Sequence, residues 1–584
     1  MVDISAITGF AVSGFSNVVD HISALPTSEA IIFDIAIILI ICAVFAFIAR
    51  MLRQPLIPAY VLAGLIIGPL VLGFIKNTEL ILAFSEIGIA FLLFTAGLEI
   101  SFRKIKEANL KKIAITGVLQ VAAIFGIAIF AGKFLELTMM QSVYIGIVMA
   151  FGSTMVVIKL LADKGELVTL YGRLILGILL LQDLVAILAI VVFMSGGFAI
   201  SPIVAAILKL VAILVIAFVL QKYVLNKLFK FAARSTELLL LSSLAVLFLF
   251  IILTYVADLS IVIGAFIAGV SLANSPFKLE LESRITPLRD FFAILFFVAL
   301  GMQVVFSGVG QYMNLFWFLI AGAIILKPII TIIFLRITGY RPRTSFLTAI
   351  SLAQLSEFSL IIGMLGVTLG VINMEIFSTI ILATILTMAL TPYLIKYKNS
   401  LYQFFKYPMK VFKFLPMYEN LEYKSEHQKS ILLIGAHRMG SVLLKELMKK
   451  KEEVLVIDYN PEIISALMKK KISAIYGDIC SPEVIKKVGT EKLKMAISTV
   501  PDYDQNIHLL KKIKAENPDV RVIVTATRIS EALHFYDIGA DYVIMPKIVA
   551  GEEIVGIMRD SKDALKKAKK NHLKHLKDIH NVLF

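Results

Sequence analysis

A series of long apolar runs between residues 31 and 396 constrains the fold of this chain more than any other feature. Short segments rich in Gly, Pro and charged residues separate the runs, and most runs have the roughly 20 residues that one helical crossing of a bilayer requires. The whole chain is 59% hydrophobic and its mean hydropathy is +0.89, which lies outside the usual range of soluble domains. We therefore expect a polytopic α-helical membrane protein embedded in a lipid bilayer.

We count thirteen predicted crossings in this region. Their approximate spans are 31–50, 55–75, 79–101, 109–133, 140–162, 171–198, 201–222, 236–257, 259–274, 288–307, 313–338, 344–370 and 374–396. We expect no cleaved signal peptide in the preceding residues 1–30, because a signal begins with basic residues and the first basic residue here is Arg50. The two cysteines, Cys42 and Cys480, do not indicate a disulfide framework.

The distribution of Lys and Arg between the crossings predicts the orientation of the chain. Loops and helix ends after the odd-numbered crossings carry most of the basic residues, whereas only Lys76 and Lys133 follow even-numbered crossings. Short loops rich in Lys and Arg stay on the cytoplasmic side of a membrane. We therefore expect a multi-pass protein of the cell membrane, with residues 1–30 outside and everything after the thirteenth crossing in the cytoplasm.

Residues 426–550 predict a Rossmann-like α/β domain, connected to the membrane region 31–396 by a linker, residues 397–425. Short β-branched runs alternate there with charged helical stretches, and the first run opens into a Gly-rich turn in "KSILLIGAHRMG". Six such runs indicate a six-stranded parallel sheet. The Lys-rich residues 551–584 are typical of a solvated or membrane-surface helix, and we expect no nucleic-acid partner.

The turn from Gly435 to Gly440 predicts a nucleotide site. Its backbone amides and the following helix N-terminus favour a phosphate, and Asp458, which ends the next strand, can accept hydrogen bonds from a ribose. His437 replaces the middle glycine of a dinucleotide fingerprint, so AMP, ADP or ATP is expected to fit more easily than NAD(H). A Rossmann-like fold with an empty or altered pocket is the alternative. The candidate nucleotide-binding residues are Gly435, His437, Arg438, Met439, Gly440, Asp458, Tyr459, Asp478 and Thr499.

Three ionisable residues lie inside predicted crossings, namely Asp183, Lys327 and Glu357. Such groups are costly in a bilayer and by default mark an ion or substrate path. A carboxylate holds a dehydrated monovalent cation or a proton, but not both well, since protonation removes the charge that binds the cation. Asp183 is therefore the predicted site for K+ or Na+, and we expect Lys327 to pair with Asp183 or Glu357 when the cation is absent. The alternative is that these residues only hold helices together as buried pairs.

Two crossings have polar centres that weaken a helix, "FGSTM" with Ser153 and Thr154, and "AQLSEF" with Ser356 and Glu357. The two centres are seven crossings apart, so the two segments run in opposite directions across the membrane. Inverted repeats with broken helices at the bilayer midplane require this arrangement. We therefore expect half-helix ends, and carbonyls freed at Ser153 and Thr154, to lie beside Asp183.

The ordered stretches "GLIIGPLVLG", "FLLFTAGLEI", "LLLQDLVAI", "GAFIAGVSLANS", "LFFVALGM" and "LAQLSEFS", followed by the nucleotide-type domain, resemble Kef-type cation/proton antiporters. The resemblance implies that Asp183 exchanges cation and proton and that Gln182 matches the potassium-selective branch. It also implies a C-terminal potassium-transport nucleotide-binding domain that dimerises and binds adenine nucleotides or NAD(H), so we expect a homodimer. The candidate transport residues are Asp183, Gln182, Ser153, Thr154, Lys327, Ser356 and Glu357. The glutathione-gated members carry an acidic inhibitory loop, and the stretch here that resembles it is "KLELESRITP", residues 278–287.

The predicted function is secondary active antiport of a monovalent cation, K+ in preference to Na+, against protons, under the control of a ligand of the C-terminal domain. A Na+/H+ antiporter of the same fold is the alternative. A ligand-gated K+ channel would need a re-entrant pore loop, and the segment around "SGVGQY", residues 307–312, is too short for one. A membrane-tethered dehydrogenase would need a substrate domain after the nucleotide fold, where only the Lys-rich tail remains, so we expect no enzyme.

Overall fold

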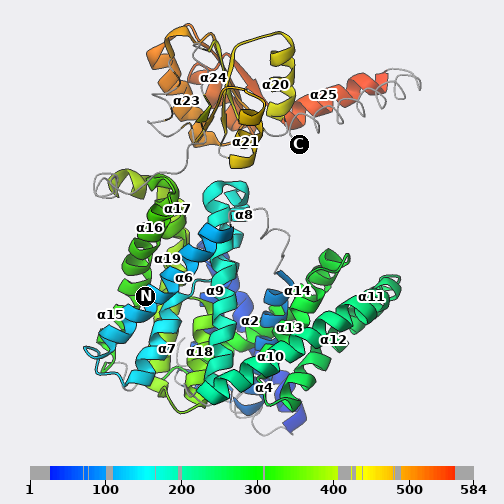
Figure 1. Cartoon of the computed structure of the whole chain (residues 1–584), viewed down its shortest axis with the longest axis vertical. Coiled ribbons are helices and arrows are strands. Elements are labelled where there is room, and N and C mark those ends of the chain that lie inside the picture. Colours follow the sequence, from blue (N-terminus) through cyan, green and yellow to red (C-terminus); the bar gives the residue numbers. More distant parts are fainter. Residues whose placement is uncertain are drawn as a thin grey trace, which may run out of the picture. The chain divides into compact units, whose positions relative to one another are not determined.

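The computed structural model describes residues 27–405, apart from 70, 76–77, 100–109, 165, 195–199 and 307–309, and residues 422–559, apart from 424–428, 437–438, 459, 478, 480–483, 485–487 and 489. The chain divides into two compact units, with the main boundary after Met417. The first unit is helical and the second contains a β-sheet (Figure 1). Most of the predicted N-terminal segment, of the linker and of the basic tail lies outside the described residues.

Ten helices of the described part are long and apolar enough to cross a membrane, and three shorter apolar helices accompany them. Each predicted span overlaps at least one of the observed helices. The predicted polytopic helical fold is therefore confirmed. The count of thirteen crossings stays a prediction, because α3 (Leu56–Ile67), α13 (Ile261–Leu272) and α18 (Glu357–Thr368) are shorter than one crossing.

One group of helices, here called the glycine-packed bundle, is formed by contacts of α4 with α13 and α14, and of α3 with α2 and α14. Gly97 and Gly269 let α4 and α13 touch along their backbones. A Cβ on Gly97 would lie 2.4 Å from the carbonyl oxygen of Phe266, and one on Gly269 would lie 2.0 Å from that of Phe94. The bundle consists of α2 (Thr27–Met51), α3, α4 (Thr78–Glu99), α10 (Ile200–Leu220), α11 (Asn226–Ala232), α12 (Thr236–Val256), α13 and α14 (Lys278–Met302).

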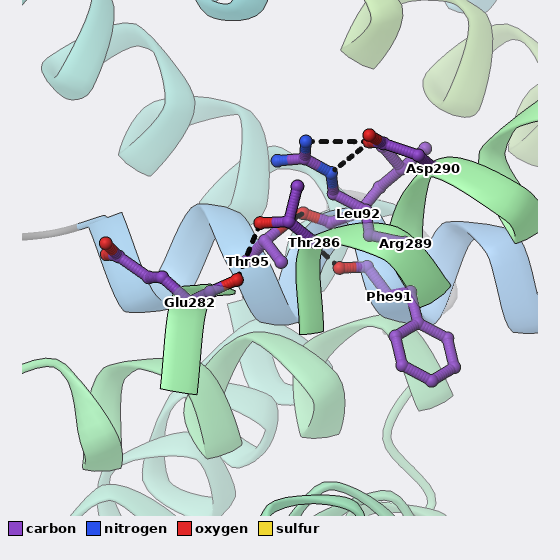
Figure 2. A network of polar contacts seen from close by, with 7 residues as sticks. All are labelled: Phe91, Leu92, Thr95, Glu282, Thr286, Arg289 and Asp290. Atoms are coloured by element: carbon purple, nitrogen blue, oxygen red, sulfur yellow. Dashed lines mark hydrogen bonds and ion pairs between the residues drawn. The ribbon is translucent and has the colours of Figure 1, made fainter. Parts of the chain in front are cut away.

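Several polar residues of the glycine-packed bundle are hydrogen-bonded within their own helices, as Figure 2 shows for α4 and α14. The hydroxyl of Thr95 donates to the carbonyl oxygens of Phe91 at 3.0 Å and Leu92 at 2.9 Å. On α14 the hydroxyl of Thr286 donates to the carbonyl oxygen of Glu282, and the guanidinium of Arg289 donates to its neighbour Asp290. These bonds satisfy the polar groups without linking one helix to another.

The remaining helices of the first unit form what we call the broken-helix bundle. The contacts that define it join α6 to α7 and α16, α18 to α7 and α19, and α17 to α16 and α19. The bundle consists of α6 (Leu110–Gly132), α7 (Met139–Ala150), α8 (Thr154–Asp163), α9 (Leu170–Met194), α15 (Met313–Ala321), α16 (Lys327–Ile337), α17 (Pro342–Ser351), α18 and α19 (Met374–Phe405).

Several helix boundaries differ from the predicted crossings. Helix α14 begins at Lys278 rather than at residue 288, because the charged stretch 278–287 continues the helix beyond its apolar part. Helix α19 continues to Phe405, so the first residues of the predicted linker are helical. Two π-helical turns, Gln221–Leu225 and Gly322–Leu326, interrupt the α10–α11 and α15–α16 helices, and hydropathy carries no signal for them.

The second unit is a Rossmann-like domain, as predicted. Its sheet has the strand order β1-β4-β3-β2-β5-β6-β7, and all strands from β2 to β7 are parallel. The predicted six strands are β2 (Ile431–Ile434), β3 (Val454–Asp458), β4 (Ala474–Tyr476), β5 (Met495–Ser498), β6 (Arg521–Thr525) and β7 (Tyr542–Ile544). The sequence did not predict β1 (Glu422–Tyr423), which pairs antiparallel with β4 and comes from the expected linker.

Both faces of this sheet are covered by helices, because alternate residues of each strand point to opposite sides. Leu432 and Ile434 of β2 belong to the core that contains α23 (Tyr503–Glu516) and α24 (Ile529–Asp537). Ile431 and Leu433 belong to the opposite core, which contains α20 (Met439–Lys449) and α21 (Pro461–Lys469). The carboxyl ends of β2 and β3 therefore meet at the edge where the Gly-rich turn begins.

Candidate functional site

Two crossings of the broken-helix bundle are interrupted at the predicted polar centres. Between α7 and α8 the residues Phe151, Gly152 and Ser153 are not helical, and the hydroxyl of Ser153 caps α8 by accepting from the backbone N–H of Val156. The second break separates α17 from α18, and the hydroxyl of Ser356 caps α18. Ser356 therefore acts as the N-cap of α18, and its predicted contact with the ion stays a prediction.

The two breaks contact each other directly. The hydroxyl of Ser359 donates to the carbonyl oxygen of Val148 at 2.6 Å, and the amide of Gln354 donates to that of Ser153 at 3.1 Å. We expected the carbonyl of Ser153 to lie beside Asp183. In the structure this carbonyl accepts the hydrogen bond from the Gln354 side chain. A half-helix end inside a membrane must have its backbone groups satisfied by neighbouring protein groups, and Gln354 does this here.

Asp183 lies in the middle of α9 with only 7% of its surface exposed. Its Oδ2 accepts a hydrogen bond of 2.8 Å from the hydroxyl of Thr154, in the first turn of α8. Its Oδ1 is buried and has no hydrogen-bond partner among the described residues. The N-terminal end of a helix favours a negative charge, so α8 stabilises the carboxylate while one oxygen stays available for a proton or a cation.

Gln182 is fully buried and holds the first break in place. Its Oε1 accepts from the backbone N–H of Gly152 at 3.0 Å, and its Nε2 donates to Oε1 of Gln120 on α6 at 3.4 Å. The side chain of Gln182 on α9 therefore links α6 to the break between α7 and α8, next to Asp183. Gln120 was not among the predicted site residues, although a glutamine in the middle of an apolar run is a signal of such a role.

Lys327 is fully buried at the start of α16, directly after a π-helical turn. Its amine donates to the carbonyl oxygen of Phe151 at 2.6 Å and to that of Gln354 at 2.9 Å. The predicted ion pair with Asp183 or Glu357 is wrong for this structure, since no salt bridge of Lys327 occurs among the residues described. The C-terminal ends of α7 and α17 carry partial negative charge, and the amine lies between them.

Glu357 is the first residue of α18 and only 4% of its surface is exposed. The Oε2 atom of its carboxylate is buried and has no hydrogen-bond partner within the described part of the chain. Glu357 begins α18 at the second break, and Thr154, the hydrogen-bond partner of Asp183, begins α8 at the first break. The predicted residues Ser153, Thr154, Gln182, Asp183, Lys327 and Glu357 therefore meet around the two breaks.

Gln354 and Thr391 belong to the same network, although the sequence analysis assigned them no role. The hydroxyl of Thr391 on α19 donates to Oε1 of Gln354 at 2.7 Å, while the Gln354 amide and carbonyl bind Ser153 and Lys327. Gln354 was within the quoted stretch "LAQLSEFS", and its position beside a carboxylate in an apolar crossing is the signal that was overlooked.

The Gly-rich turn of the Rossmann-like domain has the expected backbone form. Gly435 has a φ of +82°, which favours glycine, and its carbonyl oxygen accepts from the hydroxyl of Thr499 at 2.9 Å. Gly440 packs on this turn from the first turn of α20, which begins at Met439. The predicted residues His437, Arg438, Tyr459 and Asp478 lie outside the described residues.

Asp458 occupies the predicted position at the end of β3, but the structure gives its carboxylate another task. Oδ2 accepts from the backbone N–H of Ala436 at 2.7 Å, and Oδ1 accepts from that of Asn460 at 2.7 Å. The carboxylate therefore holds the Gly-rich turn. A contact between this carboxylate and a ribose stays a prediction.

Comparison with known sequences divides the chain at the same place as the structure. Residues 36–396 match the family described as sodium/hydrogen exchanger, transmembrane, and residues 431–546 match the TrkA-N domain. Among curated proteins, the glutathione-regulated potassium-efflux system protein KefC of Escherichia fergusonii is 27% identical over 494 residues, which are 82% of this chain and 77% of that protein. KefC of Salmonella heidelberg is 27% identical over 518 residues, 87% of this chain and 80% of that protein.

Among solved structures, the sodium proton antiporter MjNhaP1 of Methanocaldococcus jannaschii resembles the helical unit with a TM-score of 0.52. The two sequences are 17% identical, and the similarity covers 63% of this chain and 97% of MjNhaP1. At this identity the likeness concerns the fold alone.

Proposed function

The chain belongs to the sodium/hydrogen exchanger transmembrane family, and from this premise we propose that it exchanges a monovalent cation, K+ in preference to Na+, for protons at Asp183. It is a multi-pass membrane transporter rather than an enzyme, as predicted, and it carries a C-terminal TrkA-N domain. The similarity to KefC proteins over most of the chain bears out the Kef-type resemblance.

The observation that carries the proposal is the free buried oxygen of Asp183 beside two helix breaks. A carboxylate in this position binds one positive charge, either a proton or a dehydrated cation, because bound charge offsets the cost of burying an anion. Binding of one ion therefore releases the other. Competition at a single carboxylate couples the two gradients without any further group.

Lys327 and Gln354 keep the site assembled in this account. The amine of Lys327 supplies positive charge to the carbonyl ends of α7 and α17, which would otherwise be two unsatisfied acceptors inside the membrane. Asp183 therefore keeps its charge for the transported ion rather than for an internal ion pair. Glu357, with its own free oxygen, is a second carboxylate along the ion path.

The preference for K+ is supported by the names of the KefC relatives, which are potassium-efflux proteins, and by Gln182 beside Asp183. Na+/H+ exchange at the same residue is the second candidate, favoured by the fold shared with a sodium proton antiporter. We further propose thirteen crossings with inverted repeats, residues 1–30 outside and the TrkA-N domain in the cytoplasm, because the basic loops then lie inside.

Regulation through the TrkA-N domain is part of the proposal. The first turn of α20 begins at Met439, and a helix N-terminus favours a phosphate, so Met439 and Gly440 would contact AMP, ADP, ATP or NAD(H). The backbone N–H of Gly435 donates to the carbonyl oxygen of Ile457, so Gly435 would contribute by letting the ligand approach the turn closely. A ligand shifts transport only by binding its two states unequally. We expect two copies of the chain to assemble through these domains and the membrane helices.

Exchange in proteoliposomes tests the proposal. When K+ is added outside vesicles that contain the purified chain, K+ entry should drive protons out, so the vesicle interior should become more alkaline. Na+ should be less effective. The exchange should proceed without an applied membrane potential. Current that follows voltage without proton movement would instead show a channel. Calorimetric titration of the same protein with AMP, ATP and NADH tests the regulatory site, and no binding of any of them would leave the domain as a structural one.

A further inference from the structure

The cytoplasmic end of α19 carries a buried lysine that the transport site does not use. The side chain of Lys398 is only 3% exposed. Its amine donates to Oε2 of Glu166 and, at 3.1 Å, to the hydroxyl of Tyr171, and it lies 4.6 Å from the centre of the Tyr171 ring. Glu166 and Tyr171 belong to the corner that joins α8 to α9, here called the α8–α9 corner (residues 164–171).

Two further bonds reach the same short stretch of α19, Ile395–Asn399. The amine of Lys164, in the α8–α9 corner, donates to the carbonyl oxygen of Ile395 at 3.1 Å. From α17 the guanidinium of Arg343 donates to Asn399 at 3.3 Å. Helices α8, α9 and α17 are therefore all tied to one turn of α19, and these are the helices that carry Thr154, Asp183 and the second break.

Along the sequence α19 is the last helix of the membrane unit before the TrkA-N domain, so we expect a displacement of that domain to act first on α19. A solvent-exposed ion pair would couple two helices only weakly, because such a pair contributes little free energy to the structure. The Lys398–Glu166 pair differs, since its lysine is buried and breaking such a pair leaves an uncompensated charge. The α8–α9 corner must then follow α19 when α19 moves.

We propose that Lys398 is a positioning residue that couples α19 to the α8–α9 corner, and through it to Thr154 and Asp183. Asp183 lies roughly 20 Å along α9 from its first residue, so Lys398 does not touch the ion. Lys398 instead makes α8 and α9, the helices that carry Thr154 and Asp183, move together with α19. This inference rests on the proposed antiport function and adds the route by which the cytoplasmic domain acts on it.

The test compares four variants of the full-length protein in proteoliposomes. Lys398→Met and Glu166→Gln should each lower the maximal rate of K+/H+ exchange by about tenfold, with the KM for K+ changed by less than about twofold. The double variant should be no slower than either single variant, and the exchange of charges, Glu166→Lys with Lys398→Glu, should recover most of the rate. Lys209→Met is the matched control, because its ion pair with Asp258 is 42% and 89% exposed.

Hydrogen–deuterium exchange measured on the same samples gives an answer that does not depend on transport. Lys398→Met should speed amide exchange in residues 166–175 and 395–400, and Lys209→Met should leave both segments unchanged. A Lys398→Met protein with full rate and unchanged amide exchange would overturn the coupling. So would a slow variant that the charge exchange does not rescue. If the wild-type protein shows no antiport while the amide exchange changes as expected, the proposed function fails and the coupling stands.

Discussion

The two helix bundles of the membrane unit are held together in different ways. In the glycine-packed bundle the backbones of α4 and α13 touch, and buried hydroxyls such as Thr95 and Thr254 bond to carbonyls three or four residues back in their own helix. In the broken-helix bundle, buried polar side chains such as Gln182 and Lys327 bond between helices. Polar bonds that cross between helices bring Gln182, Lys327 and the two breaks together around Asp183, and this arrangement supports the proposed ion site in the broken-helix bundle.

Replacing one buried carboxylate in each bundle gives the largest expected difference. Asp183→Asn should reduce exchange by at least about two orders of magnitude, because the charge that binds the ion is lost. Asp34→Asn removes the buried carboxylate of α2, which has similar exposure, and should leave exchange unchanged. Flux in proteoliposomes, normalised to folded protein, is the measurement. An equal loss of exchange in Asp183→Asn and Asp34→Asn would show that ion exchange is not confined to the broken-helix bundle.

Lys327→Met tests the bonds that cross the broken-helix bundle. The variant keeps a side chain of similar length but leaves the carbonyls of Phe151 and Gln354 without their donor. An unsatisfied buried acceptor costs about 1–3 kcal/mol, so we expect a lower melting temperature together with slower exchange. Thermal unfolding in detergent measures the first effect. Wild-type melting and flux in this variant would show that the amine is not needed at the breaks.

Gly269→Ala tests the close backbone contact of the other bundle. The added Cβ would lie 2.0 Å from the carbonyl oxygen of Phe94, and overpacking of this kind costs about 1–3 kcal/mol. Melting temperature should fall, while the KM for the cation in the remaining folded protein should not change. Gly126→Ala on α6 is the control, because its Cβ would meet no atom within 4 Å. A changed KM in Gly269→Ala would link this bundle to ion binding.

A carboxylate outside the membrane provides the smallest expected effect. Partial burial opposes ionisation of Asp541, but hydrogen bonds from Lys514 and the backbone N–H of Val522 hold its pKa below the ordinary value. Its contribution to stability is therefore present above the unfolded pKa near 3.8 and is lost as the pH falls through the lower folded value. Asp541→Asn should cost below about 1 kcal/mol at pH 7.

Calorimetric melting of the TrkA-N domain in the full-length chain at pH 7 and at pH 3 measures this contribution. The difference between Asp541→Asn and wild type should shrink at the lower pH. A difference that stays the same at both values would mean that the charge of Asp541 contributes nothing, and that the variant acts through packing alone.

The positions of the elements could be predicted from the sequence, because burial in lipid or in a core selects apolar runs of characteristic length. The six parallel strands and both helix breaks follow from such runs and from the polar residues that interrupt them. The bounds could not be predicted where a helix continues past its apolar part, as α14 does at Lys278 and α19 does at Phe405. Hydropathy predicts whether a residue is buried in lipid or in a core, but it does not predict at which residue a helix ends.

The residues of the candidate site were easier to predict than their partners. Asp183, Lys327 and Glu357 stand out because charge is rare in a crossing. The partner of Lys327 could not be predicted, since its acceptors are the main-chain carbonyls of Phe151 and Gln354, and every residue has such a carbonyl. For the same reason the main-chain role of Asp458 in the Gly-rich turn was not foreseen.

The central claim is that a cation and a proton compete for Asp183. Titration of the purified protein with K+ in weakly buffered solution, with simultaneous calorimetry and pH recording, tests it most directly. The account predicts that K+ binding releases protons in the wild type, that the amount released varies with pH, and that Asp183→Asn neither binds K+ nor releases protons. K+ binding without proton release, or undiminished K+ binding by Asp183→Asn, would contradict it.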